Sequence, residues 1–121
     1  MTFRRFEDLR VFQLAEKLCD SIWEIVGKWN CFEKNTVGKQ LVKAADSIGA
    51  NIAEGSGRGT PNDNKRFVRI ARGSLNEVKF WIERASKRCL LDREQNEYLT
   101  KILDELAPTL NAYLKSIGRN T

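Results

Sequence analysis

The sequence predicts an all-α protein, an antiparallel four-helix bundle of up-down-up-down topology in one domain, 1–121. Apolar residues recur with a helical period in four segments, at about 7–28, 36–54, 61–89 and 92–117. The connections between these segments are short, which favours antiparallel neighbours. The chain has only two prolines in 121 residues, and this scarcity argues against a fold of strands and turns.

The first segment carries more apolar surface than one bundle core requires. Glu7 and Asp8 stand where the first turn of a helix favours negative charge. The apolar residues cover about half of the helix surface, whereas one core needs a stripe of roughly 100°. They are Leu9, Val11, Phe12, Leu14, Ala15, Leu18, Cys19, Ile22, Trp23, Ile25 and Val26. The surplus predicts a contact with another subunit, and the alternative is a helix wedged between two neighbours.

The second segment has a narrower apolar stripe and follows a predicted connection over 29–35. Its small residues, Ala44, Ala45 and Gly49 among them, permit close approach to a neighbouring helix. Gly55 is predicted to end this helix as a cap in the left-handed conformation. The glycine-rich stretch that follows Gly55 predicts a loop.

The third and fourth segments begin with recognisable capping residues. Thr60 is the predicted N-cap of the third helix, with Pro61 at its first position. Asp92 is the predicted N-cap of the fourth helix. Pro108 interrupts that helix on its polar side, which predicts a kink around the core and not a break.

Positive charge is concentrated on the third segment. Between residues 61 and 90, eight basic residues face three acidic ones, so this stretch alone accounts for the net charge of +5. Several of the basic residues recur on one helix face, as phosphate binding requires. A solvated helix face is the alternative explanation. Arg58 in the glycine-rich loop could extend this patch, and Lys39 and Lys43 form a second basic pair on the second helix. The predicted nucleic-acid-binding residues are Lys65, Arg66, Arg69, Arg72, Lys79, Arg58, Lys39 and Lys43.

A polar group lies near the turn between the second and third helices. Glu54 stands at the end of its helix, where its charge opposes the helix dipole, so Arg58 or an arginine of the third helix should compensate it. Asn51 and Ser74 are expected to form hydrogen bonds between helices. We interpret Asn51, Glu54, Gly55 and Ser74 as a structural clamp and not as a catalytic cluster.

The residue types argue against an enzyme, a metal site or a bound cofactor. The chain has no histidine and no phosphate-binding glycine motif, and its cysteines, Cys19, Cys31 and Cys89, lack CxxC spacing. Cys19 and Cys89 are expected to be small core residues. Free thiols fit a reducing cytoplasm, and the sequence predicts neither a signal peptide nor a membrane span.

The three tryptophans, Trp23, Trp29 and Trp81, are interpreted as core or interface anchors in preference to base-stacking platforms. Two functions remain open at this point. One is a homo-oligomer with a basic face for RNA or DNA. The other is a protein-interaction scaffold that docks a partner protein, with the basic face only steering association.

Four blocks spread over the whole chain form a specific combination of motifs. They are Phe6–Leu9 with Val11–Gln13, Gln40–Leu41 with Ala44–Ile48, Asn51–Gly55 with Gly57–Arg58, and Phe67–Glu77. With these blocks the sequence resembles the four-helix-bundle family encoded within intervening sequences of bacterial large-subunit ribosomal RNA genes. The resemblance implies a bundle that assembles into a homopentameric ring, without implying an activity.

A more distant similarity links the chain to the accessory proteins of diversity-generating retroelements. Those proteins form basic pentamers that bind nucleic acid and a reverse transcriptase, so this similarity implies nucleic acid as a partner at the level of fold analogy. The chain also departs from the family pattern. Where many members are acidic at the start of the third helix, this sequence has Lys65 and Arg66.

Overall fold

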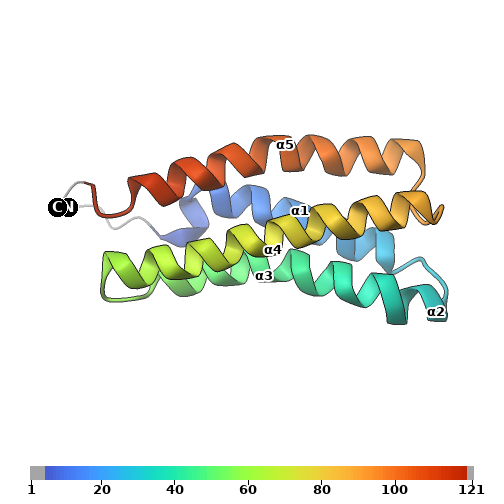
Figure 1. The fold of residues 1–121 in the computed structure, drawn as a ribbon, viewed down its shortest axis with the longest axis horizontal. Coiled ribbons are helices and arrows are strands. Elements are labelled where there is room, and N and C mark those ends of the chain that lie inside the picture. Colours follow the sequence, from blue (N-terminus) through green and yellow to red (C-terminus); the bar gives the residue numbers. More distant parts are fainter. Residues whose placement is uncertain (1–4, 120–121) are drawn as a thin grey trace.

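A computed structural model describes residues 5–119 of the chain and arranges them as four long helices packed side by side (Figure 1). These are α1 (Arg10–Val26), α3 (Lys39–Ser56), α4 (Pro61–Lys87) and α5 (Arg93–Ser116). Successive long helices run in opposite directions. Helix α1 packs against α3 and α5, and α4 packs against the same two helices, so α1 and α4 are diagonal. The predicted all-α architecture of four packed helices is confirmed.

Aliphatic side chains from all four helices form a single core. No polar side chain within residues 5–119 is fully buried. Each large aliphatic side chain removed from water stabilises the fold by roughly 1.5–3 kcal/mol, so helix packing supplies the main stabilising term. The largest fully buried side chains are Leu14, Leu18, Ile22, Leu41, Ile48, Ile52, Val68, Val78, Leu99, Leu106 and Leu110.

A short turn precedes the first long helix, which begins later than the sequence predicted. The turn η1 (Phe6–Asp8) is followed by Leu9 in an extended conformation, with φ −74° and ψ 132°, and α1 begins at Arg10. The predicted start at residue 7 is therefore wrong. The physical reason is a local aromatic contact, since the ring of Phe6 packs edge-on against that of Phe12 with centroids 4.9 Å apart.

The second helix begins earlier than the sequence predicted. Its first turn is α2 (Cys31–Glu33), and the Asn30 side chain caps this turn by accepting a hydrogen bond from the Glu33 N–H at 2.9 Å. The prediction of a connection over residues 29–35 is therefore wrong. Asparagine is among the strongest N-cap residues because it satisfies an N–H group that has no partner within the helix.

A wide π-helical segment, η2 (Lys34–Gly38), joins α2 to α3 without a break. It ends where the backbone comes very close to α1. A Cβ atom on Gly38 would lie 2.7 Å from Cγ1 of Val26 and 3.4 Å from the Trp29 ring. Only a glycine fits this approach, which brings the start of α3 against the end of α1.

Gly55 is not a left-handed cap, and this prediction is wrong. Helix α3 continues to Ser56, and the following Gly57 keeps right-handed values of φ −87° and ψ −2°. Gly55 is buried, and a Cβ atom there would lie 2.6 Å from Oδ1 of Asn64 and 3.0 Å from Cβ of Phe67. The glycine is required because α4 approaches α3 closely at this point.

The predicted caps of α4 and α5 are confirmed. The Thr60 hydroxyl accepts a hydrogen bond from the Asp63 N–H at 3.2 Å. Asp92 accepts from the Gln95 N–H at 2.7 Å, and its own N–H donates to the Gln95 side chain at 3.0 Å, which completes a capping box. Pro108 lies exposed within α5, and the helix continues past it, so the expectation that it does not break the helix holds.

Cys89 is exposed and does not belong to the core, contrary to the prediction. It takes a left-handed conformation, with φ 62°, just after α4. Its N–H donates to the Ser86 carbonyl at 3.1 Å, and the Leu90 N–H donates to the Ala85 carbonyl at 2.8 Å. This pair of bonds is a Schellman motif that closes the helix. Cys19, the other cysteine predicted in the core, is half-buried on α1.

Candidate nucleic-acid interface

Four cations project from one side of α4. Lys65, Arg69, Arg72 and Lys79 are called the basic stripe below. Lys65 is half-buried and the other three are exposed. At a rise of about 1.5 Å per residue, the stripe extends over roughly 21 Å of helix. Its far end reaches the cleft between α4 and α5, where Lys79 and Asp104 are among the lining residues. The predicted helical periodicity thus brings these four residues together.

None of the four stripe residues forms an ion pair with a carboxylate in the described part of the chain. Exposed ion pairs contribute little to stability, so the lack of partners costs the fold little, and the repulsion between cations one helical turn apart is also only about 0.2–0.5 kcal/mol per pair. They do leave a positive potential along one side of α4. Such a row of cations attracts polyanions because phosphate contacts release condensed counterions.

Arg58 and Arg66 lie in a separate cluster. Their guanidinium carbons are 4.7 Å and 4.5 Å from the centroid of the Phe67 ring. Arg58 also pairs with Glu54 at 3.9 Å, and Arg66 pairs with Asp63 at 3.5 Å. The predicted compensation of Glu54 by Arg58 is confirmed. The positive charge of both arginines is matched locally, which distinguishes them from the basic stripe.

The predicted polar clamp is present in modified form. The hydroxyl groups of Ser47 on α3 and Ser74 on α4 are 2.8 Å apart and hydrogen-bonded. The Asn51 amide does not cross to α4. It donates to the Ser47 carbonyl at 2.8 Å and to the Ser47 hydroxyl at 2.9 Å, within its own helix. Ser47 was missed as a clamp residue, although it lies one helical turn before Asn51 and therefore on the same face.

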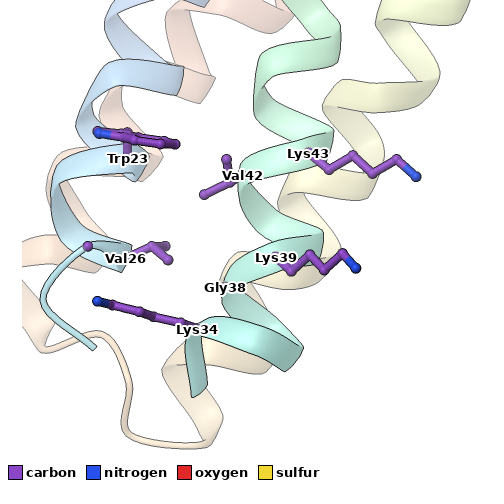
Figure 2. A pocket seen from close by; sticks show the side chains of 8 residues that line it. Trp23, Val26, Lys34, Gly38, Lys39, Val42 and Lys43 are labelled. Carbon is purple, nitrogen blue, oxygen red and sulfur yellow. The ribbon is translucent and has the colours of Figure 1, made fainter. Parts of the chain in front are cut away.

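Lys39 and Lys43 line the α3 side of a groove between α1 and α3 (Figure 2). This lysine groove has a volume of about 450 Å³. In Figure 2 the Trp23 ring projects from α1 towards Val42, while Lys39 and Lys43 extend from α3 away from that ring. The groove is lined by Trp23, Val26, Gly27, Lys34, Gly38, Lys39, Val42 and Lys43.

The tryptophans divide into two environments. Trp29 and Trp81 are half-buried and pack against the core, as the sequence predicted, and Trp81 Nε1 donates to Glu77 at 3.2 Å. Trp23 is 64% exposed, so it is not a core residue. Trp23 lines the lysine groove together with Val26 and Val42.

Lys79 of the basic stripe lies on the opposite side of the bundle from Lys39 and Lys43. Lys79 lines the α4–α5 cleft, whereas Lys39 and Lys43 line the α1–α3 groove. Because α1 and α3 form one side of the bundle and α4 and α5 the other, these residues do not form one continuous surface. The sequence predicted nucleic-acid binding for the stripe and for this second pair alike, since charge alone does not reveal which side of the bundle a residue occupies.

No group of three or more histidine, cysteine, aspartate or glutamate residues between positions 5 and 119 could hold a metal ion. No helix in this part of the chain is long and apolar enough to cross a membrane.

Comparison with known proteins gives both a family and a fold. The family model described as 23S rRNA-intervening sequence protein matches residues 7–112. A structure of a protein with unknown function from the S23 ribosomal protein family of Bacteroides thetaiotaomicron superposes with a TM-score of 0.77 at 24% identity, covering 88% of this chain and 99% of that one. No curated protein matches the sequence. Since the family model spans most of its length, the chain belongs to the 23S rRNA-intervening sequence protein family.

Proposed function

We propose that this protein is a non-enzymatic homo-oligomer that binds RNA or DNA through the basic stripe, without sequence specificity. The observation that carries the proposal is the row of four cations on α4 without a carboxylate partner among residues 5–119. The family resemblance supports a pentameric ring as the assembly, and the three free thiols suit a reducing cytoplasm.

The chemistry of the stripe favours contact with the phosphate backbone. Lysine and arginine along one side of a helix can neutralise several phosphates at once, and the release of counterions then drives binding. Contacts of this kind position a nucleic acid without reading its sequence. Repetition of the stripe around a ring would multiply the contacts on one long strand and raise the overall avidity.

The test is a charge reversal on the stripe. Arg69→Glu with Arg72→Glu should weaken binding to several RNA and DNA oligonucleotides of unrelated sequence, measured by fluorescence anisotropy at low salt. The matched control is Lys101→Glu with Lys115→Glu, which changes the net charge equally on exposed positions of α5. Unchanged affinity of the stripe variant, or an equal loss in the control, would contradict the proposal.

A second candidate function is a scaffold that docks a partner protein. It is favoured by exposed apolar side chains on α4, since Ile70 is 44% exposed and Phe80 is 54% exposed. Exposed apolar patches often mark protein contacts. A partner that stays bound after nuclease treatment, and that also binds the Arg69→Glu, Arg72→Glu variant, would favour this function over nucleic-acid binding.

A further inference from the structure

The lysine groove combines an exposed tryptophan with an unbalanced positive charge. Trp23 stands beside the groove with 64% of its surface in contact with solvent. Val26 and Val42 supply apolar lining, and the three charged residues that line the groove are all lysines. An aromatic ring beside an apolar hollow is typical of an interface that is covered by another molecule. Lys39 and Lys43 extend from α3 away from the Trp23 ring, and a covering molecule that reaches them is favoured if it is acidic.

A second groove on the same chain has the opposite charge. It lies between α1 and the start of α5, has a volume of about 520 Å³, and is called the acidic groove here. Its lining includes Glu24, Ile25, Asp92, Glu94 and Tyr98, and contains no lysine or arginine. Tyr98 is 47% exposed. At its edge, the Lys17 ammonium group lies 5.9 Å from the centroid of the Tyr98 ring.

We propose that the lysine groove of one copy of this chain binds the acidic groove of the next copy. This inference rests on the ring assembly proposed above and assigns its contact surfaces. Glu24 and Glu94 of one copy face Lys39 and Lys43 of its neighbour. The exposed aromatic ring beside each groove packs into the apolar part of the other, so both grooves are filled by one contact.

The charges select a head-to-tail contact over a two-fold one. Two lysine grooves placed face to face would set lysine against lysine, and two acidic grooves would repel each other in the same way. A contact between two different surfaces repeats from copy to copy, and it closes into a ring when each step turns in the same sense. Opposite charges on two surfaces of one chain are what such a contact needs.

The position of α1 supports closure into a ring. This helix packs against both α3 and α5, so the two grooves lie on neighbouring sides of the bundle and share α1. Trp23 lines one groove and Ile25 lines the other. The apolar face of α1 is wider than one core requires. Its middle packs in the core of its own bundle, and each of its two edges contacts a neighbouring copy. Helix α4 is diagonal to α1, so α4 and its basic stripe remain outside this contact between copies.

The experiment exchanges charges across the proposed contact. The molar mass of each protein is measured by light scattering after gel filtration. The wild-type chain should be an oligomer. Glu24→Lys with Glu94→Lys, and separately Lys39→Glu with Lys43→Glu, should each give the mass of one chain. The variant with all four changes should recover the oligomer, because the two grooves have then exchanged their charges.

Two further variants separate assembly from folding. All four exchanged residues are exposed, so circular dichroism should show helical content like that of the wild type. Tyr98→Ala removes an exposed ring without changing charge and should also lower the mass. The matched control, Lys87→Glu with Lys115→Glu, changes two exposed lysines that line neither groove and should keep the wild-type mass.

The possible failures are distinguishable. If the wild type is an oligomer and both charge-reversed pairs keep its mass, the contact lies elsewhere while the ring proposal stands. If the pairs dissociate but the fourfold variant stays monomeric, the assigned charge pairing is wrong. A wild-type chain that remains monomeric at every concentration would overturn both the contact and the ring.

Discussion

The hydroxyl groups of Ser47 and Ser74 lie 2.8 Å apart and connect the two most closely packed helices of the bundle, α3 and α4. Both side chains are half-buried. Asn51 holds Ser47 in place by donating to its carbonyl and its hydroxyl. The connection is therefore a short chain of hydrogen bonds in which each partly enclosed polar group has a partner.

Removal of the Ser74 hydroxyl should destabilise the bundle modestly. Ser74→Ala breaks the contact with Ser47, while Ser47 keeps its bonds from Asn51. The free energy of unfolding should fall by about 1 kcal/mol, the usual net value of one intramolecular hydrogen bond. Urea unfolding followed by circular dichroism measures it. Ser116→Ala, which removes an exposed hydroxyl bonded only within its own helix, is the control and should have a smaller effect.

Two glycines of the long helices should respond to alanine in opposite directions. At Gly55 a new Cβ would meet Oδ1 and the backbone oxygen of Asn64 at 2.6 Å and 3.1 Å, so Gly55→Ala should destabilise by roughly 1–3 kcal/mol. At Gly73, exposed within α4, the added Cβ would meet nothing within 4 Å beyond its chain neighbours and the backbone of its own helix. Gly73→Ala should stabilise by about 1 kcal/mol through helix propensity.

Thermal unfolding of the two alanine variants provides the comparison. A lower midpoint for Gly55→Ala and a higher one for Gly73→Ala are expected. Equal shifts of the two midpoints would show that α4 leaves room for a Cβ atom at Gly55. A loss of stability at Gly73 would instead indicate that this open position on α4 is covered by another copy of the chain.

The left-handed turn after α4 should favour glycine over the natural cysteine. Cys89 has φ 62°, a conformation that strains residues with a Cβ by roughly 1–2 kcal/mol. Cys89→Gly should therefore raise the free energy of unfolding by about 0.5–1 kcal/mol, the strain relieved less the extra entropy of an unfolded glycine. Cys89→Ala keeps the strain and should be nearly neutral. If the free energy of unfolding were higher for Cys89→Ala than for Cys89→Gly, the Schellman motif would be contradicted.

The thiols should differ in reactivity. Burial, with Asp20 and then Asp46 nearby, raises the pKa of Cys19 to about 12. Because the thiolate is the reactive form, Cys19 stays neutral and inert at pH 8 in the folded protein. Iodoacetamide should label the exposed Cys31 and Cys89 first, as mass spectrometry of peptides can show. In urea the pKa of Cys19 returns towards 9.0, and its labelling rate should rise. Fast native labelling at Cys19 would contradict its burial.

Local chemistry made much of this fold predictable. Thr60 and Asp92 act through bonds to residues three positions ahead, so the sequence around them contains the whole signal. Asn30 caps in the same way and could have been recognised from Glu33 three residues later. Gly55 was misinterpreted because its role depends on Asn64 and α4, which no local pattern contains.

The candidate site was predictable to the extent that it lies on one helix. The period of α4 places Lys65, Arg69 and Arg72 on one side without any knowledge of tertiary structure. Arg66 pairs with Asp63 three positions earlier on the same helix, so its match lies within the local sequence. The surroundings of Lys39 depend instead on α1, which lines the other side of its groove. Sequence alone therefore predicts which charges share a helix face and which have a partner one turn away, as Glu54 and Arg58 do, but not which side of the bundle a residue occupies.

Matched and unmatched arginines should contribute differently to binding. Arg69 has no carboxylate partner among the described residues, whereas Arg66 pairs with Asp63 and lies over Phe67. An unpaired cation that meets a phosphate contributes about −0.9 to the slope of log affinity against log salt on duplex DNA. Arg69→Gln should make this slope shallower by about that amount, while Arg66→Gln should leave it nearly unchanged, because Asp63 already neutralises Arg66. Anisotropy titrations across a salt series measure both slopes. Equal changes in the two slopes would show that Arg66, which lies over the Phe67 ring, also contacts phosphate.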